Sequence, residues 1–221
     1  VMTLMFTVVV PKLSAIILSC VILFSACEKD KDVKLGGAQS PMGEVGVTVS
    51  SSSASIAGVS NFTAIVTSNE DGVSVYNGSC TVNNTLLKNM LSNIPELNIN
   101  GNVVSSTSVK FRHTTEGIEF LSGPTAGIWA RYDSKVGDKY PVGSTGTYRK
   151  VVSKSTTDDY PYGFFDIKVM EVEEVPSSVL GTGIKKISYY ANHRFGLVGI
   201  KFTFDDNSEA HFPVYMSAEN D

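Results

Sequence analysis

The chain is poor in the residues that usually bind metals or form disulfides. Its 221 residues include three Cys, three His and one Trp. None of the histidines or cysteines has an H-x-x-x-H or C-x-x-C spacing, so the common signatures of a zinc site are absent. We therefore expect no metal and no other cofactor. With so few thiols, stability is expected to come from burial rather than from a disulfide framework.

Charge is also sparse in this sequence. Eighteen Lys and Arg stand against 22 Asp and Glu, for a formal net charge of −4, and the basic residues form no cluster. A mildly acidic chain without a basic patch argues against nucleic acid and anionic membrane surfaces as partners. Beyond the first 26 residues, no apolar run approaches the roughly 20 residues that a membrane-spanning helix needs.

The longest apolar run lies near the N-terminus and stops at a cysteine. Residues 13–24 (LSAIILSCVILF) follow Lys12; they suit the hydrophobic region of an export signal and are too short to span a bilayer. Two small residues and then Cys27 follow, ahead of a charged stretch. This junction resembles the lipobox of bacterial lipoproteins. The resemblance implies a signal peptide over 1–26, a diacylglycerol on the Cys27 sulfur and attachment to a membrane.

Two other interpretations of this junction stay open. Phe24 replaces the aliphatic residue that usually lies three positions before the lipidated cysteine. A plain secreted protein with ordinary cleavage is the first alternative, but Phe24 is bulky for that peptidase as well. Lipidation at Cys20 is the second, and it would leave six largely apolar residues behind the lipid. We expect Cys27 to be the anchor and the protein to be an outer-membrane lipoprotein of the cell envelope.

The remaining chain divides by composition. Residues 27–43 are charged and then rich in Gly, Gln, Ser and Pro, which is typical of a flexible tether. Residues 44–102 are expected to form an N-terminal β region with a short helix. Residues 103–221 are expected to form a C-terminal antiparallel β region, which can share one domain with the preceding region.

Local patterns in 44–102 predict a hairpin and a helix. Strands over 62–67 and 73–82 flank an Asp71-Gly72 turn. The apolar alternation slips at Asn77-Gly78, which predicts a β-bulge there and places Cys80 on the apolar face as a buried, inert thiol. The predicted helix carries its apolar residues at helical spacing. These apolar residues are Leu86, Leu87, Met90 and Leu91. Asn84 or Thr85 can cap the start of the helix, and Pro95 ends it.

Further strands are predicted after an Asn100-Gly101 turn. They are expected at 103–113, 128–132, 148–152, 164–175, 184–191, 198–204 and 210–215. Val198, Ile200 and Phe202 are expected to share one face, and Pro213 places the last strand at a sheet edge or at a bulge. Alternation with one polar face predicts an all-β fold with one short helix, mainly antiparallel, as a sandwich or a partly open barrel.

Aromatic rings crowd into the segment DDYPYGFF, residues 158–165. Pro161 and Gly163 turn the chain, so the four rings are not expected to enter one core. Exposed rings beside carboxylates are a common way to hold sugars. The candidate ligand-binding residues are therefore Tyr160, Tyr162, Asp158 and Asp159. The alternative is that these rings pack a β-core and its corners.

The chain resembles uncharacterised lipoproteins of gut-dwelling Bacteroidetes-type bacteria in four segments: TTEGIEF, YDSKVGDKYPVG, DDYPYGFFDIKV and ANHRFGLVGIKFTF. The resemblance implies no activity. In that group, acidic residues after the lipidated cysteine direct export to the outer face of the outer membrane. Glu28, Asp30 and Asp32 lie in these places, although lysines interrupt them. A solvated tether explains the same residues.

No catalytic signature is present in the sequence. There is no G-x-S-x-G elbow, and GTGIKK lacks the third glycine of a dinucleotide loop. We therefore expect a non-catalytic binding or interaction module for a glycan or an envelope protein. The alternatives are a structural subunit of a surface assembly, such as a pilus or adhesin, and an envelope enzyme.

Overall fold

The computed structural model describes residues 35–51, 58–176 and 183–221. They belong to one compact unit, Lys34–Asp221. The predicted signal peptide, the predicted lipidation site Cys27 and residues 27–34 of the predicted tether lie outside the described residues. No helix within the described ranges is both long enough and apolar enough to cross a membrane.

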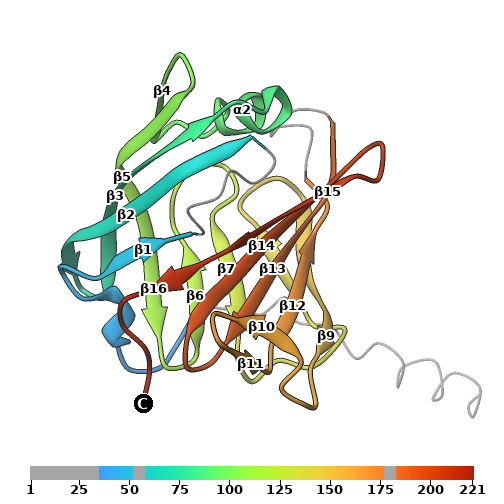
Figure 1. Ribbon diagram of the computed structural model, residues 1–221. Helices are drawn as coiled ribbons and strands as arrows, with labels where there is room; N and C mark the ends of the chain where they lie inside the picture. Colours follow the sequence, from blue (N-terminus) through green and yellow to red (C-terminus); the bar gives the residue numbers. More distant parts are fainter. Residues whose placement is uncertain (1–34, 52–57, 177–182) are drawn as a thin grey trace, which may run out of the picture. The chain divides into compact units, whose positions relative to one another are not determined.

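Two antiparallel sheets and a short α-helix dominate the described chain, which confirms the predicted all-β fold class (Figure 1). The first sheet contains β1 (Thr48–Ser50), β2 (Val59–Glu70), β3 (Val73–Val82), β4 (Leu97–Asn100), β5 (Val103–Thr114), β6 (Gly117–Phe120), β7 (Gly127–Arg131) and β16 (Tyr215–Met216). The second sheet contains β8 (Lys139–Val142), β9 (Thr147–Lys154), β12 (Met170–Glu174), β13 (Ile184–Asn192), β14 (Gly196–Phe204) and β15 (Glu209–Pro213). The remaining elements are the 3-10 helix η2 (Pro41–Gly43), the helix α2 (Thr85–Leu91) and a hairpin of β10 (Tyr160–Tyr162) and β11 (Phe165–Ile167).

The strand order joins the two predicted β regions into one unit. The first sheet has the order β16-β1-β2-β3-β5-β6-β7, with β4 also paired to β5, and the second has the order β15-β14-β13-β12-β9-β8. Strand β3 is hydrogen-bonded to β5, and β1 to β16. Strands from 44–102 therefore pair directly with strands from 103–221.

The chain connects the two sheets at both of their edges. At one side, β7 leads to β8, and Gly127 approaches so closely that a Cβ there would lie 2.7 Å from the Pro141 carbonyl oxygen. At the other side, β15 continues into β16 through Val214, whose N–H donates to the Val198 carbonyl at 3.0 Å. The two curled sheets therefore form a partly open barrel whose inner face is lined by both sheets.

The predicted β2–β3 hairpin and its bulge are confirmed. Asp71 and Gly72 form the turn with positive φ angles of 51° and 76°, as a two-residue turn of type I′ requires. The register between β3 and β5 shifts between Tyr76 and Gly78, so the bulge lies where the slipped alternation places it. Cys80 consequently faces the interior with the apolar side chains.

The predicted helix is confirmed as α2. The Asn84 side chain accepts a hydrogen bond from the Leu87 N–H at 3.0 Å, which satisfies one free donor of the first turn. Leu87 and Met90 are buried against the sheet, and the helix ends ahead of Pro95. Pro213 lies in β15, at the edge of the second sheet, as its missing N–H predicts.

The tether interpretation is wrong for residues 35–43, which are part of the folded unit. Ser40 and Met42 have no solvent exposure. The Ser40 N–H donates to the His113 carbonyl at 3.0 Å, and its hydroxyl donates to Asn220 Oδ1 at 2.6 Å. The small residues that suggest a linker instead allow this segment to pack closely on β5.

Two strand boundaries differ from the sequence prediction. Asn100 pairs with Val103, so the turn residues are Gly101 and Asn102, one position later than expected. The strand expected over 164–175 is divided into β11 and β12. The first part belongs to the separate hairpin and only the second joins the sheet.

A bulge in β14 reverses the direction of one predicted core residue. The register between β13 and β14 shifts between Tyr190 and Ala191, and Val198 has no pairing partner in β13. Leu197 and Ile200 face the interior, whereas Val198 is buried with the β10–β11 hairpin. The prediction that Val198 shares a face with Ile200 is therefore wrong.

Candidate functional site

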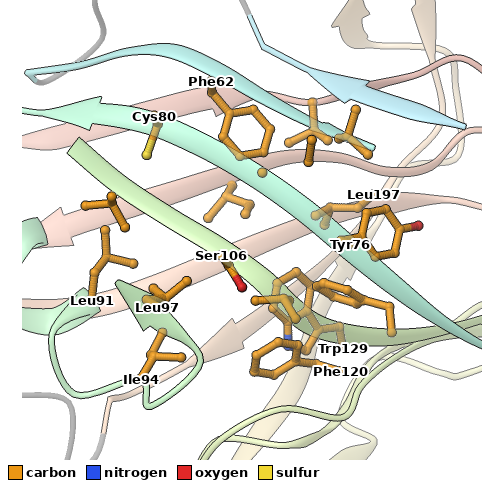
Figure 2. Close-up of a pocket in the computed structure, with 18 of the residues that line it drawn as sticks. Phe62, Tyr76, Cys80, Leu91, Ile94, Leu97, Ser106, Phe120, Trp129 and Leu197 are labelled. Carbon is orange, nitrogen blue, oxygen red and sulfur yellow. The ribbon is translucent and has the colours of Figure 1, made fainter. Parts of the chain in front are cut away.

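The inner faces of the two sheets line an apolar cavity of about 330 Å³ (Figure 2). Such a volume lies within the range of small-molecule pockets, which is about 300–1,000 Å³. Its wall from the first sheet includes Tyr76, Phe111, His113, Phe120 and Trp129. The second sheet contributes Ile187, Tyr189, Leu197, Ile200 and Phe202. The helix α2, the segment after it and the start of β4 contribute Met90, Leu91, Ile94 and Leu97.

The cavity exists because small residues meet across three neighbouring strands. Ala64 of β2 pairs with Gly78 of β3, and Gly78 pairs with Ser106 of β5. All three line the cavity, and Figure 2 shows the Ser106 side chain there. A Cβ at Gly78 would lie 2.8 Å from the Ala64 Cβ, so the backbones are close but no side chain fills the space between the sheets.

A second apolar cavity of about 180 Å³ adjoins the first. The two share wall residues that include Phe62, Cys80, Met90 and Phe202. None of the described residues that line either cavity is Asp, Glu, Lys or Arg. The two adjoining cavities therefore offer an apolar space whose described wall carries no charged side chain.

The two ends of the larger cavity differ in chemistry. At one end, Trp129 stacks on Tyr189 with ring centroids 4.7 Å apart, and Phe111 meets Trp129 edge-on at 5.1 Å. At the other end, Leu91 and Leu97 form an aliphatic wall (Figure 2). We call these the aromatic end and the aliphatic end.

Two buried polar atoms belong to rings of the aromatic end. The Tyr76 hydroxyl lies 3.3 Å from the Met42 carbonyl oxygen and 3.0 Å from His113 Nε2, and the donor in the second contact depends on the His113 tautomer. His113 Nδ1 has no partner among the described residues. The indole Nε1–H of Trp129 likewise has no acceptor there. Burial lowers the pKa of His113 to about 4, so the ring is neutral near pH 7.

A buried ion pair supports the aromatic end from behind. Arg149 Nε donates to Glu174 Oε2 at 2.7 Å, and each side chain is only 1% exposed. The Arg149 guanidinium also donates to the carbonyls of Thr125 at 2.7 Å and Ile128 at 3.3 Å. Tyr189 donates its hydroxyl to Glu174 Oε2 at 3.0 Å. Arg149 thus links the second sheet to β7 of the first and fixes the ring that faces Trp129.

The sequence-predicted sugar site lies elsewhere, on the outward face of the second sheet. Tyr160 and Tyr162 are only 9% and 8% exposed. Tyr160 stacks on Tyr190 at 5.1 Å, and Tyr162 packs against Phe195 at 4.9 Å and Tyr215 at 5.2 Å. Tyr160 and Tyr162 are therefore not the exposed rings that a sugar site requires, and the alternative interpretation, rings that pack the corners of a β-core, describes them. The hairpin covers an outward apolar patch that would otherwise face water.

The rest of the predicted site does not converge on a ligand either. Asp158 and Asp159 are exposed in the loop before β10. Phe164, at the tip of the hairpin, has its side chain fully in solvent. His211 contacts Tyr160 through a 2.7 Å hydrogen bond from or to Nε2. Within the described ranges, no group of three or more His, Cys, Asp or Glu is placed to hold a metal ion.

The cavity was not predicted from the sequence. Its signal is weak but present: Ala64, Gly78 and Ser106 are small residues on strand faces that are otherwise apolar, and none is placed at a turn. Their alignment depends on strand register, which the sequence alone does not give. No protein-family model, no curated protein and no solved structure was found to match this chain.

Proposed function

We propose that this chain is a non-catalytic binding module of the cell envelope whose ligand is an apolar small molecule held between the two sheets. The observation that carries the proposal is the apolar cavity of about 330 Å³. An engineered cavity of about half that volume binds benzene in another protein. This apolar ligand replaces the glycan suggested by the sequence, because Tyr160 and Tyr162 are buried.

Energetics supports a ligand in this space. The wall of the cavity is apolar, and removing apolar surface from water stabilises a complex by about 25 cal/mol per Å². A ligand that covers this wall with apolar surface of its own therefore gains free energy from both surfaces.

The chemistry of the wall supports binding without catalysis. No carboxylate, Lys or Arg among the described residues lines the cavity. A general acid or base would have to be the neutral His113 or a Tyr hydroxyl, and burial raises the pKa of Tyr76 and Tyr189. Cys80 is the one thiol in the wall, and burial raises its pKa. A thiol with a raised pKa is mostly protonated and is therefore a poor nucleophile.

Binding can be tested with the soluble chain 28–221, which keeps every described residue. An uncharged apolar fluorophore, N-phenyl-1-naphthylamine, is expected to bind and to change the emission of Trp129, the sole tryptophan and a wall residue. At one hundred times its Kd, the ligand should raise the free energy of unfolding by about 2.7 kcal/mol. Fluorescence titration and thermal melting measure the two effects.

A matched pair of variants assigns this binding to the cavity. Ser106→Phe fills the cavity and is expected to weaken binding at least about tenfold, while stability is kept or rises by about 0.5–2 kcal/mol, as cavity filling usually does. Thr107→Phe places the same ring on the exposed neighbour in β5 and should leave binding unchanged. Equal binding by both variants would place the fluorophore outside the cavity and refute the proposed function.

The second part of the proposal is the anchor at Cys27, which makes the protein an outer-membrane lipoprotein. The apolar run of 13–24, the small residues before Cys27 and the charged stretch after it support this assignment. Several acyl chains, each contributing about 0.8 kcal/mol per buried CH₂, give near-permanent attachment.

Cys27→Ala should abolish palmitate labelling and leave the precursor uncleaved. Cys20→Ala is the matched control, since it removes the competing thiol in the same apolar run, and it should label and mature normally. Metabolic labelling and partition into detergent measure both variants. Loss of label in Cys20→Ala alone would move the anchor to Cys20.

A structural subunit of a surface assembly is the second candidate function. One observation favours it: Phe164 at the tip of the β10–β11 hairpin is fully exposed and Phe165 beside it is half exposed. Large apolar side chains that project into water are typical of contact sites for other proteins. This role concerns the outer surface and is compatible with a ligand inside.

A further inference from the structure

We propose that the cavity selects an uncharged, elongated amphiphile, such as a long-chain alcohol, and rejects the corresponding fatty-acid anion. The proposal rests on the proposed function and specifies its ligand. The hydroxyl of the ligand lies at the aromatic end, which holds Trp129 and His113, and its chain runs toward the aliphatic end.

The first argument is the lack of a counter-charge. A carboxylate buried without a cation is strongly disfavoured, because it loses its hydration and gains no ion pair. No Lys or Arg lines either cavity in the described chain. Arg149, behind the aromatic end, already donates to Glu174 and to two backbone carbonyls, so it is not free for a ligand anion.

Histidine does not replace the missing cation. His113 is the one imidazole in the wall, and its burial lowers its pKa to about 4. From pH 6 to pH 8 it is therefore neutral and does not balance a carboxylate. It can still exchange hydrogen bonds with an uncharged group.

The second argument is the pair of unsatisfied atoms at the aromatic end. The Trp129 N–H and His113 Nδ1 have no hydrogen-bond partner among the described residues. Both rings pack against Phe111, with centroids 5.1 Å and 5.8 Å from it. A hydroxyl both accepts and donates, so it can pair with either nitrogen whichever tautomer His113 adopts, whereas a carboxylate only accepts.

The third argument concerns the direction of the ligand chain. The aromatic end carries these polar atoms, whereas the opposite end is formed by Leu91, Ile94 and Leu97 (Figure 2). The smaller cavity adjoins through shared residues such as Met90 and Phe202. An alkyl chain that starts at Trp129 therefore has continuous apolar surface along its length.

The test compares two ligands of equal chain length, 1-decanol and decanoate, by displacement of N-phenyl-1-naphthylamine from the chain 28–221. At pH 8, decanoate is expected to bind at least about 100-fold more weakly than decanol. If only the neutral acid binds, its apparent affinity should rise about tenfold for each pH unit from 8 to 6, because both values lie above the carboxyl pKa. Decanol binding should not change over this range.

The outcomes separate the two proposals. Equal displacement by decanol and decanoate at pH 8 would overturn the selection for neutral ligands while leaving the apolar binding site in place. If the fluorophore itself fails to bind, the proposed function is wrong and the ligand inference falls with it. Stronger binding of decanoate would require a cation in the site and would also overturn the inference.

A variant pair tests the hydroxyl contact. Trp129→Phe keeps an aromatic ring and removes the N–H donor, so decanol should lose about fivefold more affinity than N-phenyl-1-naphthylamine, which has no hydroxyl. Tyr132→Phe is the control, because the Tyr132 hydroxyl is also buried without a partner among the described residues but does not line the cavity. It should leave decanol binding unchanged. An unchanged decanol affinity in Trp129→Phe would remove the hydroxyl from this end.

Discussion

Replacing Tyr160 and Tyr162 together by Ala is expected to lower the free energy of unfolding by about 4 kcal/mol or more. Truncation of one buried aromatic ring usually costs about 3–5 kcal/mol, and both rings are more than nine-tenths buried. Their effects overlap because they belong to one cluster around Val198. For a chain of this size the melting temperature should fall by about 10 °C.

Phe164→Ala is the matched control in the same hairpin. Its ring is entirely in solvent, so its removal should change stability by less than about 0.5 kcal/mol. Chemical denaturation of the three proteins gives the comparison directly. If the Tyr160 and Tyr162 double variant is as stable as the wild type, the two rings face solvent, and the sugar site predicted from the sequence becomes tenable again.

The parts of the fold that the sequence predicts are those encoded by local chemistry. Asp71-Gly72 adopts positive φ angles that few other residue pairs accept. Asn84 caps α2 through a bond that lies within the helix's own first turn. The long alternating strands need no knowledge of their partners, because period-two apolar patterning identifies them by itself. Shorter strands such as Gly117–Phe120 and Lys139–Val142 contain too few residues for that pattern to be seen.

The candidate site depends on contacts between residues far apart in the sequence. The cavity follows from the alignment of Ala64, Gly78 and Ser106, and a shift of one residue in either pairing would remove it. The burial of Tyr160 follows from the bulge at Val198, which turns an apolar side chain to the outward face. Composition and spacing do not report either register, so the sequence alone neither decides between an exposed sugar site and buried rings nor predicts the cavity.

The other large effect is expected at the buried ion pair. Arg149→Met should lower the free energy of unfolding by about 3–5 kcal/mol, since it leaves Glu174 as an uncompensated buried charge. It also removes the donors to the carbonyls of Thr125 and Ile128, two of the polar links between the sheets. Urea denaturation measures the loss of stability. N-phenyl-1-naphthylamine binding should weaken as well, because Glu174, the acceptor of the Tyr189 hydroxyl, loses the partner that holds it in place.

Two controls separate the cost of a stranded charge from the loss of side-chain volume. Arg194→Met makes the same substitution in an ion pair of the same 2.7 Å length whose side chains are 55% and 45% exposed, and it should cost less than about 1 kcal/mol. Replacing Arg149 by Met and Glu174 by Leu together removes both charges, and most of the lost stability should return. If the paired replacement is as unstable as Arg149→Met alone, the hydrogen bonds to the β7 side of the cavity, and not the charge of Glu174, determine the stability of this end.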